Sequence, residues 1–263
     1  METIIYFFTG TGNSLKIAKD LTKKLKDSEL IPIAKVCQTE TIHSITEKVG
    51  FIFPLYYSGL PKIVDDFINN LDLSKSNYIF SVITSAGDIN EQPLQQLNKI
   101  LETKSKALNA GFYVTMPSNY IIGYEVPSEE YQNECFEKAS SQVELIAEII
   151  NSRKENLNQA IFKKNVRRSE ELNKTFREKV NESDKSFYTD ENCTSCGICE
   201  QVCPMNNIML IEGKPQWQHK CQQCLACINF CPEISIQFGV DTLKTQRYHH
   251  PEITLQEIID QHK

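Results

Sequence analysis

The sequence predicts an α/β protein, in which a doubly wound, five-stranded parallel sheet precedes a second, smaller α+β domain. Two observations lead to this prediction. In the first 150 residues, short apolar runs alternate with segments whose apolar residues recur at helical spacing. Farther along, eight of the ten cysteines fall between Cys193 and Cys231. The alternation is typical of parallel sheets covered by helices, and the cysteines indicate a domain that folds around metal.

The first half of the sheet is predicted from three apolar runs. Thr3 to Phe8 is rich in Ile and Phe, and Asn13 to Lys26 follows it with its apolar residues on one helical stripe. Leu30 to Ala34 is the second candidate strand. Val49 to Phe53 is the third, and Pro54 stops it.

The second half of the sheet follows the same pattern. Ile63 to Leu71 is predicted to be helical, Tyr78 to Thr84 is the fourth candidate strand, and Pro93 to Leu101 is the next helix. Ala107 to Val114 is the fifth candidate strand, and Glu129 to Asn151 is a long helix. About five strands in some 150 residues suit a doubly wound sheet.

Three segments follow this predicted domain of residues 1–151. Residues 152–186 form a helical basic connector: positions 151–185 carry 10 basic and 6 acidic residues, and Ser152 to Lys185 contains no Gly, Pro or Cys. Its basic residues form either a solvated face or a surface that docks on the acidic second domain. Residues 187–239 are that small second domain, which needs metal or disulfides to fold. Residues 240–263 are a C-terminal tail.

Charge and hydropathy narrow the class of protein. The net charge of −6 argues against a nucleic-acid partner, because phosphate binding requires clustered positive charge. No apolar run approaches the roughly 20 residues that cross a bilayer. Met1 to Lys35 lacks the pattern of a signal peptide. We therefore expect a cytoplasmic protein that binds neither nucleic acid nor membrane.

The cysteines form two copies of the pattern C-x₂-C-x₂-C-x₃-C-P, which run from Cys193 to Pro204 and from Cys221 to Pro232. Thiolates this close together can cap three corners of an iron–sulfur cube, and the fourth corner needs a distant cysteine. Structural zinc sites use separated C-x₂-C pairs and do not match. Each run has an apolar residue four positions after its proline, Ile208 and Ile236, which suggests a pseudo-symmetric core packed around the metal.

This part of the chain resembles the bacterial two-cluster ferredoxins, in which the fourth cysteine of each run binds the other cluster. The resemblance implies two [4Fe–4S] clusters. The ligands of the first cluster would be Cys193, Cys196, Cys199 and Cys231, and those of the second would be Cys221, Cys224, Cys227 and Cys203. Cys37 and Cys135 lie outside the pattern and are interpreted as small buried apolar residues.

A loop rich in glycine and threonine joins the first strand to the first helix. It consists of Thr9, Gly10, Thr11, Gly12, Asn13 and Ser14. Backbone amides and hydroxyls at a helix N-terminus bind anions. The loop is not a Walker A motif and matches G-x-G-x-x-G poorly. It resembles the FMN phosphate loop of flavodoxins, T/S-x-T-G-x-T/S. The alternative is an ordinary strand–helix turn.

Two more loops fall at the carboxyl ends of strands, where such sheets bind ligands. The resemblance to flavodoxins assigns the first to the flavin ring, with Tyr56 or Tyr57 stacking on it, unless these tyrosines only pack the loop. Its cofactor-binding residues would be Tyr56, Tyr57, Ser58 and Gly59. Those of the second loop, at the pyrimidine edge, would be Ser85, Ala86, Gly87 and Asp88. Asn119 and Tyr120, after the fifth strand, close over the flavin or face the second domain.

As a whole the chain resembles the flavodoxin–ferredoxin fusion proteins of anaerobic bacteria and archaea. The resemblance extends to the tail around Arg247 to Pro251. It implies a flavodoxin-like domain that binds FMN and a ferredoxin-like domain that holds two [4Fe–4S] clusters. It also implies electron transfer, but it says little about the partner, which we expect to be an external redox protein such as a ferredoxin, a hydrogenase or another low-potential oxidoreductase.

The sequence is compatible with several functions. A flavin exchanges one or two electrons and each cluster exchanges one, so the leading hypothesis is an electron carrier that couples the two. The alternatives are a redox sensor, a ferredoxin with a flavin-free structural domain, and an enzyme that reduces a small substrate. For that enzyme the sequence offers no acid–base pair, since the five histidines lie outside the proposed flavin loops. A homodimer would place the flavin of one chain beside the clusters of another.

Overall fold

The computed structural model describes the chain except for residues 1, 38–41, 45, 88–91, 158–166 and 263. Its centre is a five-stranded sheet with the order β2-β1-β4-β6-β7, in which all neighbouring strands are parallel. The strands are β1 (Thr3–Phe7), β2 (Ser28–Pro32), β4 (Lys48–Pro54), β6 (Tyr78–Ser85) and β7 (Ala110–Thr115). The predicted doubly wound sheet is therefore confirmed.

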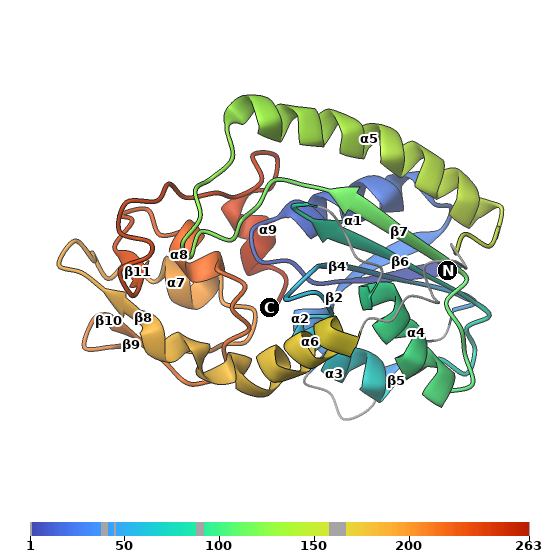
Figure 1. The fold of residues 1–263 in the computed structure, drawn as a ribbon, viewed down its shortest axis with the longest axis horizontal. Coiled ribbons are helices and arrows are strands. Elements are labelled where there is room, and N and C mark those ends of the chain that lie inside the picture. The colour runs from blue at the N-terminus through green and yellow to red at the C-terminus, as the bar shows by residue number, and fades with distance from the viewer. Residues whose placement is uncertain (1, 38–41, 45, 88–91, 158–166, 263) are drawn as a thin grey trace.

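Helices cover both faces of the sheet (Figure 1). On one face α1 (Asn13–Lys24) packs against α5 (Glu129–Asn151). On the other lie α2 (Ile33–Val36), α3 (Lys62–Asn70) and α4 (Gln92–Thr103). The central strands β4 and β6 are buried along almost their whole length, which explains their unbroken apolar sequences.

The second predicted strand is placed differently in the structure. β2 begins at Ser28, and Ile33 and Ala34 belong to α2 instead. Pro32 ends the strand at the edge of the sheet, where its missing N–H needs no partner. A short extra ladder, β3 (Ile42–His43) with β5 (Leu71–Asp72), was not predicted.

The connector packs on the α/β domain. It contains α6 (Arg167–Lys179) and the 3₁₀ helix η1 (Val180–Ser186), while residues 158–166 lie outside the described part. Asn173 of α6 is fully buried, and its side chain accepts a hydrogen bond from Gln96 Nε2 of α4 at 3.0 Å. Arg177 forms an ion pair with Asp65 of α3 at 2.5 Å. α6 thus packs on the α/β domain through one side, while its charged residues Glu171, Lys174, Glu178 and Lys179 are exposed.

The second lobe is built from short elements, which Figure 1 shows in orange and red beside the sheet. They are β8 (Phe187–Thr189), α7 (Ile198–Gln201), β9 (Ile208–Ile211), β10 (Lys214–Trp217), α8 (Ala226–Asn229) and β11 (Ile236–Phe238). β9 pairs with β10 and β8 pairs with β11, both antiparallel. Ile208 and Ile236 are buried together in one apolar cluster, which agrees with the shared core that the repeat suggests.

The tail returns to the α/β domain. Its helix α9 (Leu255–Ile259) begins at a capping box formed by Thr254 and Glu257. Ile253, Ile258 and Ile259 join the apolar core of that domain. No helix in the described part of the chain is long and apolar enough to span a membrane.

Candidate functional site

A cleft of about 550 Å³ opens at the carboxyl ends of β1, β4, β6 and β7. The predicted residues that line it are Thr9, Gly10, Thr11, Asn13, Ser14, Tyr56, Tyr57, Ser85 and Ala86. Gly12, Ser58, Gly59 and Gly87 are not among the lining residues, and Asp88 lies outside the described residues. Asn119 and Tyr120 also line the cleft, so all four loops meet there.

The first loop presents groups that suit a phosphate. Gly12 has φ 103°, a left-handed conformation that favours glycine, and it precedes the first turn of α1. Its N–H donates to Thr9 Oγ1 at 3.1 Å, and the hydroxyls of Ser14 and Thr84 lie 2.8 Å apart. The first turn of α1 carries no acidic residue. Uncapped amides and hydroxyls at a helix N-terminus are the donors that an anion needs, so the loop fits the FMN phosphate.

The two tyrosines of the second loop point in different directions. Tyr57 is 39% exposed, and its ring stacks on Phe176 of α6 with centroids 4.2 Å apart and planes at 14°. Its hydroxyl lies 3.0 Å from that of Tyr120. Tyr56 turns inward, and burial raises its pKa well above the ordinary value. The aromatic wall of the cleft therefore includes Phe176, a connector residue that lies outside every motif from which the site was predicted.

Asn173 attaches the connector to the loop that carries Tyr56 and Tyr57. Its Nδ2 donates to the carbonyl oxygens of Tyr56 at 2.9 Å and Leu60 at 3.2 Å. A Cβ on Gly59 would lie 2.3 Å from Asn173 Cγ, so glycine leaves the space that the amide needs. The helical pattern of the connector is visible in the sequence, but nothing in it signals which residue is buried against the loop.

The structure brings each predicted quartet of cysteines together. Cys193, Cys196, Cys199 and Cys231 line one small cavity, and Cys203, Cys221, Cys224 and Cys227 line another. Each cavity thus receives its fourth cysteine from the other run. All ten cysteines of the chain are free. Within the described residues, no group of three or more His, Cys, Asp or Glu side chains converges on one point that could hold a single metal ion.

The chemistry of the two quartets suits iron–sulfur cubes, whose irons each take one thiolate. Burial raises the pKa of the Cys199 thiol to about 12 and that of Cys221 to about 11. Loading such a site must therefore expel protons, as thiolate metal sites do. Cys196 is exposed, whereas Cys203 and Cys224 are buried. The assignment of the cysteines as ligands stays a prediction.

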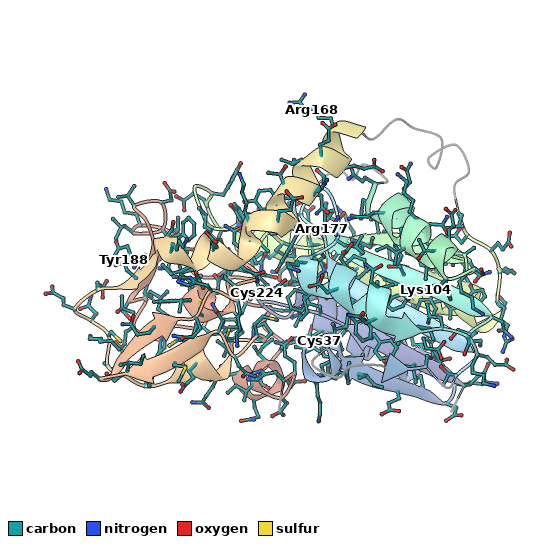
Figure 2. The ribbon with its side chains drawn as sticks, turned by 90° about the horizontal axis from the view of Figure 1, so that it is seen from below. Cys37, Lys104, Arg168, Arg177, Tyr188 and Cys224 are labelled. Carbon is teal, nitrogen blue, oxygen red and sulfur yellow. The ribbon has the colours of Figure 1, made fainter. Side chains whose placement is uncertain are left out.

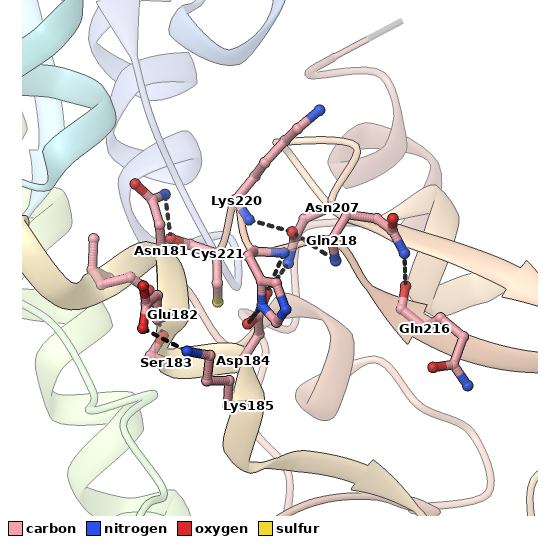
Figure 3. A network of polar contacts seen from close by, with 12 residues as sticks. Asn181, Glu182, Ser183, Asp184, Lys185, Asn207, Gln216, Gln218, Lys220 and Cys221 are labelled. Carbon is pink, nitrogen blue, oxygen red and sulfur yellow. Dashed lines mark hydrogen bonds and ion pairs between the residues drawn. The ribbon is translucent and has the colours of Figure 1, made fainter.

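A polar network holds the loop before Cys221 (Figure 3). The buried Asp184 of η1 accepts hydrogen bonds from Asn207 Nδ2 at 2.9 Å and from the backbone N–H of His219 at 3.0 Å. His219 Nδ1 lies 2.7 Å from the same carboxylate. Asn181 Nδ2 donates to the Cys221 carbonyl at 3.1 Å. η1 thereby fixes the second cysteine run to the connector.

The second quartet borders the cleft. A Cβ on Gly10 would lie 2.2 Å from the carbonyl oxygen of Cys224, so the phosphate loop packs directly on the cysteine loop. Asn119 Nδ2 donates to the same oxygen at 3.4 Å, and Gln223 lines the cleft itself. The Ile63 N–H donates to Gln222 Oε1 at 2.9 Å. Figure 2 shows Cys224 where the two lobes meet.

Comparison with protein families agrees with this architecture. A flavodoxin domain model matches residues 4–117, and a 4Fe–4S dicluster domain model matches residues 149–248. The chain is therefore an electron-transfer flavo-iron–sulfur protein, with FMN and iron–sulfur clusters as the cofactors that its domains indicate. A flavodoxin domain followed by a dicluster domain is the arrangement of a flavodoxin–ferredoxin fusion.

Solved structures resemble part of the chain. The FMN-dependent NADH-azoreductase of Bacillus anthracis str. Ames Ancestor, in complex with FMN, is 10% identical with a TM-score of 0.42, over 57% of this chain and 100% of that one. Rubredoxin oxygen:oxidoreductase of Desulfovibrio gigas is 15% identical with a TM-score of 0.37, over 58% of this chain and 36% of that one. NAD(P)H:quinone oxidoreductase of Methanothermobacter marburgensis is 9% identical with a TM-score of 0.39, over 57% and 96%. No curated protein matches the sequence.

Proposed function

We propose that this protein passes electrons one at a time between an external low-potential redox protein and FMN, through two [4Fe–4S] clusters in series. The first cluster is held by Cys193, Cys196, Cys199 and Cys231, and the second by Cys203, Cys221, Cys224 and Cys227. The observation that carries the proposal is the packing of the phosphate loop on the second cysteine loop, where Gly10 meets the Cys224 carbonyl. FMN and the second cluster are then neighbours within one chain.

The exposure of the cysteines indicates the order of the two clusters between the partner and the flavin. Cys196 of the first quartet is exposed, whereas Cys224 of the second is 9% exposed and packs with the core of the α/β domain. The external partner therefore exchanges electrons with the first cluster, and the second cluster exchanges them with the flavin. Because the cleft and the second quartet adjoin in one chain, the route requires no second copy.

The lining of the cleft supports a carrier of electrons. It consists of hydroxyl, amide, backbone and aromatic groups, which bind and orient a flavin. When bound, FMN supplies one- and two-electron chemistry, and the protein sets its position and potential. The lining residues are uncharged, and burial in such surroundings disfavours added negative charge. A low flavin potential follows, which matches low-potential clusters and a role in anaerobic metabolism.

The partner in this proposal is a one-electron protein such as a ferredoxin, a hydrogenase or another low-potential oxidoreductase. We place the protein in the cytoplasm, because free cysteines and iron–sulfur clusters suit a reducing compartment.

Composition is the first test. The protein is purified without oxygen, and iron, acid-labile sulfide and FMN are measured per chain, with visible spectra before and after dithionite. The proposal predicts about eight irons and one FMN per chain, both reduced by dithionite. Eight irons without flavin, even after FMN is added, would refute the coupling of the two cofactors. Zinc in place of iron would refute the electron carrier altogether.

A further inference from the structure

The segment Arg247–His250, here called the strap, has no part in the function proposed above. It follows the second domain and leads into the tail. Arg247 Nη2 donates to the Ile236 carbonyl and to Gln237 Oε1, both at 3.1 Å. Both acceptors lie on β11, the strand that follows Cys231. The strap therefore begins attached to the lobe that holds the cysteines.

Tyr248 bridges that lobe to the phosphate loop. Its backbone N–H donates to Asn229 Oδ1 at 2.9 Å, and Asn229 lies on α8, two residues after Cys227. Its hydroxyl donates to Asn13 Oδ1 at 2.7 Å. The amide of Asn13 in turn donates to the Pro117 carbonyl at 2.8 Å, on another loop of the cleft. Tyr248 is 3% exposed, so these bonds are shielded from water.

The two histidines continue the attachment. The His249 ring stacks on Phe230, next to Cys231, with centroids 4.7 Å apart and planes at 17°. The His250 N–H donates to the Thr11 carbonyl at 2.8 Å. That bond directs the Thr11 carbonyl toward the strap. Four consecutive residues thus contact the second lobe and the phosphate loop.

We propose that the strap couples the two cofactor sites through Tyr248, so that FMN on the phosphate loop stabilises the cluster beside α8 and the cluster tightens FMN binding. Tyr248 is a positioning residue, since it acts through Asn13 and Asn229. The inference rests on the proposed function. Coupling between two binding sites is reciprocal, so each effect must have the same magnitude in free energy. One buried hydrogen bond supports a factor of about five.

The test is Tyr248→Phe in the full chain with its clusters loaded, because this variant removes the bond to Asn13 and keeps the ring. The rate at which an iron chelator bleaches the clusters is measured with FMN bound and after FMN is removed by dialysis. In the wild type we expect FMN to slow bleaching about fivefold, and in the variant the ratio should fall toward one. Reciprocity holds for binding equilibria, so a titration of the cluster-loaded protein should show an affinity for FMN about fivefold weaker in Tyr248→Phe than in the wild type.

Tyr78→Phe is the matched control. Tyr78 is also 3% exposed, and its hydroxyl donates to the Lys154 carbonyl at 2.8 Å, at the start of β6 and away from the cleft. This variant should keep the protection by FMN. The strap proposal is overturned if Tyr248→Phe keeps wild-type protection, or if both variants lose it equally. Either result is compatible with the proposed electron-transfer function, whereas a wild type that binds no FMN would overturn both proposals.

Discussion

Substitution of Gly10 by Ala tests the junction between the phosphate loop and the second cysteine loop. The new Cβ would lie 2.2 Å from the Cys224 carbonyl oxygen, whereas an ordinary contact begins at 3.4 Å. The neighbour is backbone, so the two loops must separate by about 1 Å. Overpacking of this kind costs about 1–3 kcal/mol. For a chain of this size we expect the melting temperature to fall by about 2–10 °C.

The same displacement should weaken FMN binding, because the loop that moves carries the amides and hydroxyls of the phosphate site. A loss of about 1.4–2.8 kcal/mol corresponds to about ten- to a hundredfold in Kd. Thermal unfolding and a fluorescence titration with FMN measure the two effects. Gly87→Ala is the control for stability, since its Cβ would meet no atom within 4 Å. If Gly10→Ala melts and binds FMN as the wild type does, the loops are not packed as described.

Three further predictions concern the connector, the tail and the cysteines. Asn173→Ala removes three hydrogen bonds at a fully buried site and should lower the melting temperature by about 5–10 °C, whereas the exposed Asn69→Ala should not change it. Burial lowers the pKa of His250 from 6.5 to about 4. Its contribution to the free energy of unfolding is therefore complete above pH 6.5 and is lost as the pH falls toward 4. In denaturant unfolding, His250→Gln should lose less of its free energy of unfolding than the wild type over that range. Iron analysis should find about half of the iron missing in Cys196→Ser and none missing in Cys37→Ser, and equal iron in both variants would contradict the ligand assignment.

The sheet was predictable because most of its strands carry a clear local pattern of apolar residues in the sequence. The buried strands β4 and β6 must be apolar on both faces, and their runs stand out from the sequence around them. The helix α5 begins and ends where predicted, since Ser128 caps it and two acidic residues fill its first turn. The edge strand β2 was misplaced by two residues, because it is only half-buried and carries a weak pattern.

The candidate site was predictable only in its motifs. The two cysteine runs carry their spacing in the sequence, and the crossing of the fourth cysteines follows from resemblance. The roles of Tyr56 and Tyr57 depend on a turn in which Tyr57 adopts φ 45°, and no propensity predicts that conformation for tyrosine. Phe176 and Tyr248 reach the cleft or its loops through contacts far apart in sequence, which one sequence does not reveal.

Electron transfer within a single chain can be followed directly. In the protein loaded with FMN and clusters, a light flash reduces the flavin at the expense of an added amine electron donor, which is oxidised, and the absorbance of the clusters is followed without oxygen. Because the phosphate loop packs on the second cysteine loop, we predict that the clusters are reduced at a rate independent of protein concentration. A rate that rises in proportion to protein concentration, or clusters that stay oxidised, would show that flavin and clusters do not form one internal route.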